Sequence, residues 1–190
     1  MSKQFAFDNA QICKAGHVAN IYKKLHPERN TEHCLICPEE VISACPSCNT
    51  PIRGGYYSTE VWNTTYAGSI ISPQHSNTRT HTQELTSLDN YQFPAYCHKC
   101  GQPYPWTKER LAVGEQIVDA LEGLDPEQKS QLKALFPDLI IETPRSNLAV
   151  IELAKIVDAF RSFGKDVFIN WLSNNMAPVL YALLKTLLRL

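Results

Sequence analysis

Six of the seven cysteines in this 190-residue chain occur as Cys-x-x-Cys pairs, and no other feature restricts the fold as strongly. The three pairs are Cys34 and Cys37, Cys45 and Cys48, and Cys97 and Cys100. Two such pairs supply the four ligands of a tetrahedral zinc site. Gly or Pro soon after a pair permits a turn whose N–H groups point at the sulfurs and disperse their charge. The pattern therefore predicts a zinc ribbon.

The cysteine pattern also indicates the compartment. The count is odd, most cysteines are paired at short spacing, and the N-terminus has no apolar signal segment, all of which argue against a secreted disulfide scaffold. Neighbouring sulfurs suit one shared metal ion better than two long-range bridges. We therefore expect metal-bound thiolates in a reducing, cytoplasmic environment. No apolar run approaches the ~18 residues that a membrane-spanning helix requires.

The remaining cysteine lies in a second kind of metal motif, Cys13-Lys-Ala-Gly16-His17. Gly16 permits a tight turn between the thiolate and the imidazole. The first zinc site is expected to comprise Cys13, His17, Cys34 and Cys37. His33 is a rival fourth ligand, but it adjoins another ligand in sequence, and adjacent positions chelate poorly.

The second zinc site is expected to comprise Cys45, Cys48, Cys97 and Cys100. Only seven residues separate Cys37 from Cys45, so an interleaved pairing of the ligands between the two sites stays open. Four ligands leave no open position for water, which favours two structural Zn²⁺ ions over a catalytic one. Structural zinc supplies folding free energy on the order of 10 kcal/mol, which a region this poor in long apolar runs needs.

A long segment divides the second pair of cysteines from the third. We expect an insertion at 58–92 within a double zinc-ribbon-like module of residues 1–105, with a short strand near residues 41–44. Residues 1–9 are expected to be a loose lead-in. Strand-like residues occur at 56–57, 61–62 and 70–71.

The run from Ser72 to Asn90 is polar and is expected to be mobile. His75 and His81 lie in this run without a neighbouring cysteine pair or carboxylate motif. That setting favours solvent-exposed histidines over a third metal site or a catalytic site.

The apolar period becomes helical after residue 106, and we expect an all-α domain over 107–190. Helices are predicted over about 107–122, 126–136, 146–172 with a break or kink at Gly164, and 177–190. Asp125 and Gln128 form a capping box with Pro126 between them. The whole chain is thus predicted to be α+β, with a small metal-stabilised β module followed by helices.

Charge and motifs limit the possible functions. The formal charge is −1 and no region is basic, which argues against tight non-specific nucleic-acid binding. There is no Gly-x-Ser-x-Gly, phosphate-binding Gly loop or His-Glu-x-x-His, so we expect no enzyme, no catalytic residue and no small-molecule substrate.

The aromatic residues near the cysteines are expected to pack over the metal site; they are Tyr56, Tyr57, Tyr96, Tyr104 and Trp106. A stacking platform for single-stranded nucleic acid is the alternative. The terminal helix, with Lys185 and Arg189 on one face, is expected to be buried in a bundle or at a dimer seam. A segment at 176–190 that meets a membrane or a partner groove is the second alternative.

Three segments carry a resemblance to a known family: Ala10 to Cys13 with Gly16-His17, Cys45 to Gly54, and Pro94 to Thr107. The order and the amino-acid sequences of these segments resemble a family of uncharacterised bacterial proteins, domain of unknown function 2321, whose N-terminal part is zinc-ribbon-like. The resemblance covers residues 10 to about 122 best. It implies zinc and a bacterial source, and it carries no established activity. The insertion at 58–92 is longer than the family pattern.

These features together favour a non-enzymatic zinc-binding interaction or adaptor module. The ribbon would present a rigid surface, and the apolar C-terminal helices would mediate self-association or partner binding. One alternative is a nucleic-acid-binding zinc ribbon, which the absence of a basic region disfavours. The other is a membrane-active effector that uses the C-terminal helices.

Overall fold

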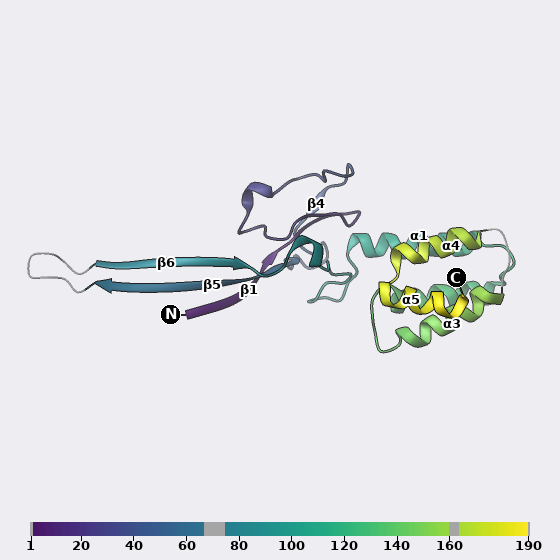
Figure 1. Ribbon diagram of the computed structural model, residues 1–190. Coiled ribbons are helices and arrows are strands. Elements are labelled where there is room, and N and C mark those ends of the chain that lie inside the picture. Colours follow the sequence, from purple (N-terminus) through teal and green to yellow (C-terminus); the bar gives the residue numbers. More distant parts are fainter. Residues whose placement is uncertain (1, 67–74, 160–163, 190) are drawn as a thin grey trace, which may run out of the picture. The chain divides into compact units, whose positions relative to one another are not determined.

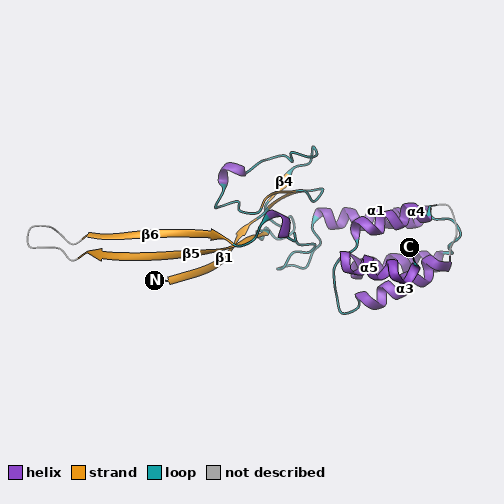
Figure 2. Cartoon of the chain, in the orientation of Figure 1, coloured by secondary structure: helices purple, strands orange, loops and turns teal. Residues whose placement is uncertain are grey.

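The computed structural model describes residues 2–66, 75–159 and 164–189 (Figure 1). The chain divides into two compact units, Met1–Trp106 and Thr107–Leu190. The strands all lie in the first unit, and the second is helical (Figure 2). The predicted α+β fold is therefore confirmed.

The first unit contains two three-stranded antiparallel sheets. The larger sheet, in the order β1-β5-β6, is formed by β1 (Ser2–Asn9), β5 (Arg53–Tyr66) and β6 (His75–Glu84). The smaller sheet, in the order β3-β2-β4, is formed by β2 (Gln11–Cys13), β3 (Val18–Asn20) and β4 (Val41–Ile42). Single 3₁₀ turns occur at Pro27–Arg29 and Leu88–Asn90. The short strand predicted near residues 41–44 is present as β4.

Two expectations for this unit were wrong. Residues 1–9 are not a loose lead-in, because β1 pairs with β5 and sets Phe7 opposite Tyr56. The polar run from Ser72 to Asn90 includes β6, which pairs with β5 along its whole length. Threonines at alternate positions of β6 have β-branched side chains that suit a strand, and their polarity concealed this preference. The predicted strand residues at 70–71 lie outside the described residues.

The Tyr22 side chain links the segment that follows β3 to the hairpin formed by β5 and β6. A Cβ on Gly55 would come within 2.4 Å of the Tyr22 ring, so the ring needs a glycine at this position. The Tyr22 hydroxyl oxygen lies 2.9 Å from the carbonyl oxygens of both Tyr56 and Thr86. It also accepts a hydrogen bond from the Thr86 N–H at 3.1 Å. One phenol thereby holds the base of β5 and the end of the hairpin together.

Asp8 and His26 anchor the same connecting segment. The buried Asp8 carboxylate accepts hydrogen bonds from the N–H groups of Lys24 and Leu25, at 3.1 and 2.9 Å. The His26 ring lies between two carboxylates: its Nδ1 is 2.9 Å from Glu28, and its Nε2 contacts Glu84 on β6. The segment is therefore tied to β1 through Asp8 and to β6 through His26.

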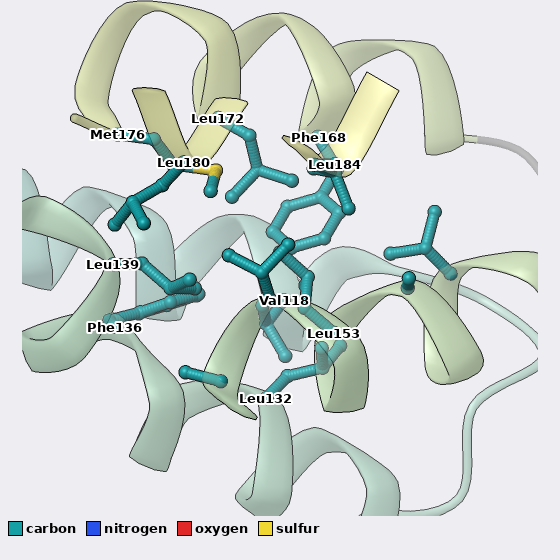
Figure 3. Packing of buried hydrophobic residues seen from close by; sticks show 14 of the residues in the cluster. Val118, Leu132, Phe136, Leu139, Leu153, Phe168, Leu172, Met176, Leu180 and Leu184 are labelled. Carbon is teal, nitrogen blue, oxygen red and sulfur yellow. The ribbon is translucent and has the colours of Figure 1, made fainter. Parts of the chain in front are cut away.

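The helical unit is a bundle around one apolar core (Figure 3). Its helices are α1 (Pro105–Ala120), α2 (Pro126–Ile140), α3 (Ser146–Ala159), α4 (Lys165–Asn175) and α5 (Pro178–Leu188). All five contribute to the core, whose buried side chains include Val118, Phe136, Leu153, Phe168 and Leu184. The Asp125–Gln128 capping box is present. Gly164, with φ 94°, separates α3 from α4.

The predicted end of the second helix was wrong. α2 continues through Pro137 to Ile140. Proline normally ends or kinks a helix because it lacks an N–H and its ring clashes with the preceding turn. Here Phe136 and Leu139, on either side of Pro137, are both buried in the core. Their packing stabilises the continued helix against the local preference.

Gly54→Ala is expected to destabilise the first unit. A Cβ at this position would lie 2.2 Å from the carbonyl oxygen of Ile21 and 2.7 Å from the carbonyl carbon of Asn9. Both obstacles are backbone atoms, so we expect a cost of about 1–3 kcal/mol or more. The urea dependence of thiol exposure measures this, with Thr59→Ala on the same strand as control. An unchanged midpoint for Gly54→Ala would contradict the close approach.

His26 is expected to titrate above its ordinary value. The Glu84 and Glu28 carboxylates favour the imidazolium and raise the pKa of His26 above 6.5. The stabilisation is fully present below the unfolded-state pKa and is lost as the pH rises through the folded-state pKa. NMR titration of the ring protons measures this pKa, and Glu84→Gln is expected to lower it. Glu32→Gln, at an exposed glutamate that does not contribute to the shift, should leave it unchanged.

Candidate metal centres

The first four predicted ligands gather at the edge of the smaller sheet. Cys13 ends β2, His17 follows one tight turn later, and Cys34 and Cys37 come from a separate loop. The His17 Nδ1 lies 3.4 Å from the Cys13 Sγ, 3.7 Å from the Cys34 Sγ and 3.3 Å from the Cys37 Sγ. The Cys13 and Cys37 sulfurs are 3.8 Å apart. All four donor atoms thus face one common centre.

The other four predicted ligands form a second cluster from two turns that are far apart in sequence. The Sγ atoms of Cys45 and Cys100 are 3.7 Å apart, and those of Cys48 and Cys97 are 3.6 Å apart. In each cluster all donor atoms lie within 4.8 Å of one another. Each ligand therefore joins the set to which the sequence analysis assigned it, and the structure shows no interleaved pairing.

These distances fit a bound metal ion. With metal–sulfur distances of about 2.3 Å and metal–nitrogen distances of about 2.0–2.1 Å, the edges of a ligand tetrahedron are about 3.8 Å between sulfurs and about 3.5 Å between sulfur and nitrogen. The observed separations of 3.6–3.8 Å and 3.3–3.7 Å agree with these edges. Disulfide sulfurs would be about 2.05 Å apart, and all seven cysteines are free. Both clusters could hold metal ions.

The three Cys-x-x-Cys pairs adopt the same turn. In each, the N–H of the first cysteine donates to the carbonyl oxygen five residues later, at 2.8–2.9 Å. The residue before the first cysteine also forms an isolated β-bridge with the residue six positions after that cysteine. The bridges are His33 with Glu40, Ala44 with Pro51, and Tyr96 with Pro103. The sequence thus encodes one structural unit three times, which we call the cysteine knuckle.

Left-handed backbone conformations occur in two of the three knuckles and in the Cys13 turn, whereas the Cys34 knuckle has Pro38 at the equivalent position and no residue with positive φ. Asn49 and Gly101 each lie four residues after the first cysteine of their knuckles, with φ 56° and 70°. Asn and Gly are the residues that adopt this region most readily. The Cys13 turn is one residue shorter, with the Cys13 N–H donating to the His17 carbonyl at 2.9 Å, and Gly16 there has φ 94°.

Backbone N–H groups within the knuckles favour the thiolate form of some cysteines. The N–H of Ile36, 3.4 Å from the sulfur, and that of the next residue lower the pKa of Cys34 to about 6. The N–H groups of Cys100 and Lys99 likewise lower the pKa of Cys97 to about 6. One ligand of each cluster is therefore prepared to bind a metal as a thiolate near neutral pH.

The second thiols of these pairs behave in the opposite way. The N–H of Gln102 acts to lower the pKa of Cys100, but burial and the three neighbouring sulfurs raise it to about 12. Sulfurs this close cannot all ionise unless a cation neutralises them. A divalent metal ion supplies that charge, so these ligand sets suit the metal-bound state.

Two hydroxyl-bearing residues lie beside the second cluster: Thr50, which the sequence analysis missed, and Tyr104, which it expected to pack there. The Thr50 hydroxyl lies 3.1 Å from the Cys48 sulfur and lowers the Cys48 pKa, as a hydroxyl that donates to a thiolate does. The Tyr104 hydroxyl is buried without a standard hydrogen bond, and burial together with the Cys97 thiolate raises the Tyr104 pKa. A hydroxyl two positions after a Cys-x-x-Cys pair was the available signal for Thr50.

The two clusters differ in their surroundings. Cys45 and Cys97 are part of an apolar core, together with Ile52, Tyr104 and Trp106. The Tyr104 and Trp106 rings stack with centroids 4.7 Å apart, and Trp106 donates to the Pro94 carbonyl oxygen at 3.0 Å. In the first cluster only Cys13 is buried. The second cluster is thus the centre of a small core, whereas the first lies near the surface.

The other predicted residues fall in different places. Tyr56 contacts Phe5 and Phe7 on the larger sheet. His33 is exposed and is not a member of the first cluster. His81 is exposed on β6, with its ring 6.3 Å from that of Trp62. Across residues 2–66, 75–159 and 164–189, the two clusters are the only groups of three or more potential metal ligands.

A comparison with protein families matches one family across most of the chain. The model for domain of unknown function 2321, described as an uncharacterized protein conserved in bacteria, matches residues 6–75 and 69–177. The chain belongs to this family. The matched region extends beyond the cysteine motifs through the end of α4. No curated protein and no solved structure matches the chain significantly. Among the described helices, none is long and apolar enough to cross a membrane.

Removing single ligands is expected to separate the two centres. Cys34→Ser should remove one metal ion per chain and leave the second, because the clusters share no ligand. Cys97→Ser should remove the other ion and also lower the urea midpoint of unfolding, because Cys97 is a buried part of the core around Trp106. Elemental analysis of the purified chain measures the metal content.

Ser47→Ala is the matched control, since this exposed residue lies inside a knuckle without donating a ligand. It should retain both ions. Two ions in Cys34→Ser, or a larger loss of stability in Cys34→Ser than in Cys97→Ser, would contradict the assignment.

Proposed function

We propose that both clusters bind Zn²⁺ in closed structural sites and that the protein is a non-enzymatic, cytoplasmic interaction module. The donor set supports zinc, since Cys₃His and Cys₄ tetrahedra are typical structural zinc sites. Four protein ligands fill each site and leave no position for a reacting water. In this proposal the metal ions stabilise one conformation of a recognition surface.

The observation that carries the proposal is the tip of the first knuckle. Leu35 and Ile36, between the ligands Cys34 and Cys37, are 90% and 73% exposed. The backbone turn of the knuckle restricts the backbone of both residues, so little backbone conformational entropy is lost when a partner covers them. Exposed apolar side chains on a rigid turn are suited to a complementary apolar pocket.

The charge around this tip favours a particular type of partner. Glu32 and Glu39 are exposed nearby in sequence, and Glu40 pairs with Lys14 at 2.6 Å. An apolar tip with acidic neighbours complements a protein pocket with a basic rim. The same charge opposes a nucleic-acid backbone or an anionic membrane surface.

The C-terminal helix offers a second apolar surface. Leu180 and Leu184 of α5 are buried in the core of the helical unit, which supports the expectation of a bundle helix. Val179 and Leu187 on the same helix are 67% and 45% exposed. In this proposal the exposed side chains contact a partner protein. Substituting them leaves the core intact, whereas deleting the whole helix would remove Leu180 and Leu184 from the core.

The nucleic-acid alternative has less support. Trp106 and Tyr104 are 1% and 0% exposed, so neither ring is available to stack on a base. Substituting Trp106 would test the stability of the core around the second cluster, not a stacking surface.

Leu35→Ser combined with Ile36→Ser is expected to abolish partner capture while the metal content stays at two zinc ions per chain. Affinity purification of the tagged full chain from a bacterial host, followed by mass spectrometry, measures capture. Leu88→Ser is the control, because Leu88 is a comparable exposed apolar residue in the same unit. Equal recovery of partners by the double variant would overturn the role of the tip. Iron, or fewer than two zinc ions in the unaltered chain, would overturn the metal assignment.

A further inference from the structure

The larger sheet has little of its own core to stabilise it. Every side chain from Lys3 to Phe7 on β1 is exposed, and so is every side chain from Thr78 to Glu84 on β6. Consecutive residues of a strand point to opposite faces, so both faces of this sheet contact solvent. A sheet of so few strands normally needs a packed face for stability. Backbone pairing and not a packed face therefore holds this sheet together, and further pairing at an edge would extend it.

The edge of the sheet at β1 is open for further pairing. β1 is hydrogen-bonded to β5 and stands at the end of the strand order. Phe5 and Phe7 are 53% and 49% exposed. Large apolar side chains on an exposed edge strand favour pairing with a strand of another chain. The charged residue on this stretch, Lys3, turns back to its own sheet: its Nζ lies 3.0 Å from Glu60 and 5.6 Å from the Phe5 ring centroid. The other cation near this edge, the Arg53 guanidinium of β5, lies 4.6 Å from the centroid of the Phe7 ring. Both charges are thus held against side chains of their own copy.

We propose that β1 pairs antiparallel with β1 of a second copy, so that two three-stranded sheets form one continuous six-stranded sheet about a twofold axis. The partner is thus a second copy of this chain. The inference goes beyond the proposed adaptor role, because it requires neither a metal of a particular kind nor the Leu35–Ile36 tip.

The limits of the free edge define the register. At its far end Asp8 is buried, and the Asn9 carbonyl oxygen already accepts a hydrogen bond from the Lys23 N–H at 3.0 Å. The free edge of β1, which begins at Ser2, therefore ends at Phe7. Within it we place the twofold axis at Phe5, because this sets the two Phe5 side chains opposite each other. This register pairs residues 3–7 of both copies and keeps the same face of both copies together.

This register is favourable for each pair of side chains. It sets Phe5 opposite Phe5 of the second copy, and aromatic cross-strand pairs stabilise sheets. It sets Lys3 opposite Phe7 and not opposite a second Lys3, so like charges of the two β1 strands do not face each other. On the other face, Gln4 lies opposite Ala6, so neither charge nor bulk opposes the approach. A self-complementary edge of this kind favours a second copy over an unrelated peptide.

The contact is small, so the dimer should be weak. Five residues from each copy bury much less than the about 1,600 Å² of a standard stable interface. We expect a monomer–dimer equilibrium with a dissociation constant in the micromolar range, on the order of 1–100 µM.

Analytical ultracentrifugation of the full chain across that concentration range tests the proposal. The unaltered protein should shift from monomer to dimer, and Phe5→Lys with Phe7→Lys should weaken dimerisation by at least roughly tenfold, because like charges then face each other. Leu148→Lys is the matched control, since Leu148 is 55% exposed and lies on α3. Thiol exposure in urea confirms that each variant is folded.

A second experiment tests the register. Phe5→Cys should form a disulfide between copies when diamide takes up the two thiol hydrogens, because directly opposed Cα atoms lie about 4.5–5.5 Å apart, within disulfide range. Phe7→Cys, which would face Lys3, should cross-link far less, and the unaltered chain serves as the control for its own thiols. A protein that stays monomeric, a dimer unaffected by the lysine pair, or a dimer that cross-links at residue 7 rather than 5 would overturn the proposal.

Discussion

The first unit depends on two clusters, in each of which four donor atoms converge on one point. The cysteine knuckle achieves this with backbone geometry alone: one N–H-to-carbonyl bond and one β-bridge orient two sulfurs per turn. The second cluster then brings together knuckles that are 48 residues apart. Because Ile52, Tyr104 and Trp106 pack around it, the apolar core of this unit and its ligand set form at the same place. A metal ion bound there would thus stabilise the same contacts that burial stabilises.

The ligand sets and the helices were predictable because both are encoded locally. A Cys-x-x-Cys spacing fixes its own turn, and the Asp125–Gln128 box fixes its own helix start. Grouping of the ligands was less determined, because only seven residues separate Cys37 from Cys45. Assigning Cys34 and Cys37 to the incomplete Cys13–His17 motif gave the grouping that the structure shows. The helical period over 146–172 likewise indicated α3, in which Ala154 and Val157 are buried, whereas the apolar Leu148 and Ile151 are exposed.

The strands of the larger sheet were not predictable in this way. β1 and β6 carry polar or exposed residues and acquire their conformation from β5, a partner about fifty residues from β1 in sequence. A strand without a buried face has no alternating apolar pattern to recognise. The same reasoning applies to Pro137, where the local rule predicts an end and packing of Phe136 and Leu139 overrides it. Contacts distant in sequence decided each of these cases.

The split origin of the second cluster imposes an order of events during synthesis. All ligands of the first cluster have been made once residue 37 is added, whereas the second is complete only at residue 100, which is 100 − 37 = 63 residues later. At translation rates of about 5–20 residues per second, this interval lasts roughly 3–13 s. During that time Cys45 and Cys48 are a half-site on the growing chain. The Cys13–His17 turn and the first knuckle can capture a metal ion while the ribosome is still producing the hairpin, and Cys45 and Cys48 must stay reduced until Cys97 and Cys100 are made.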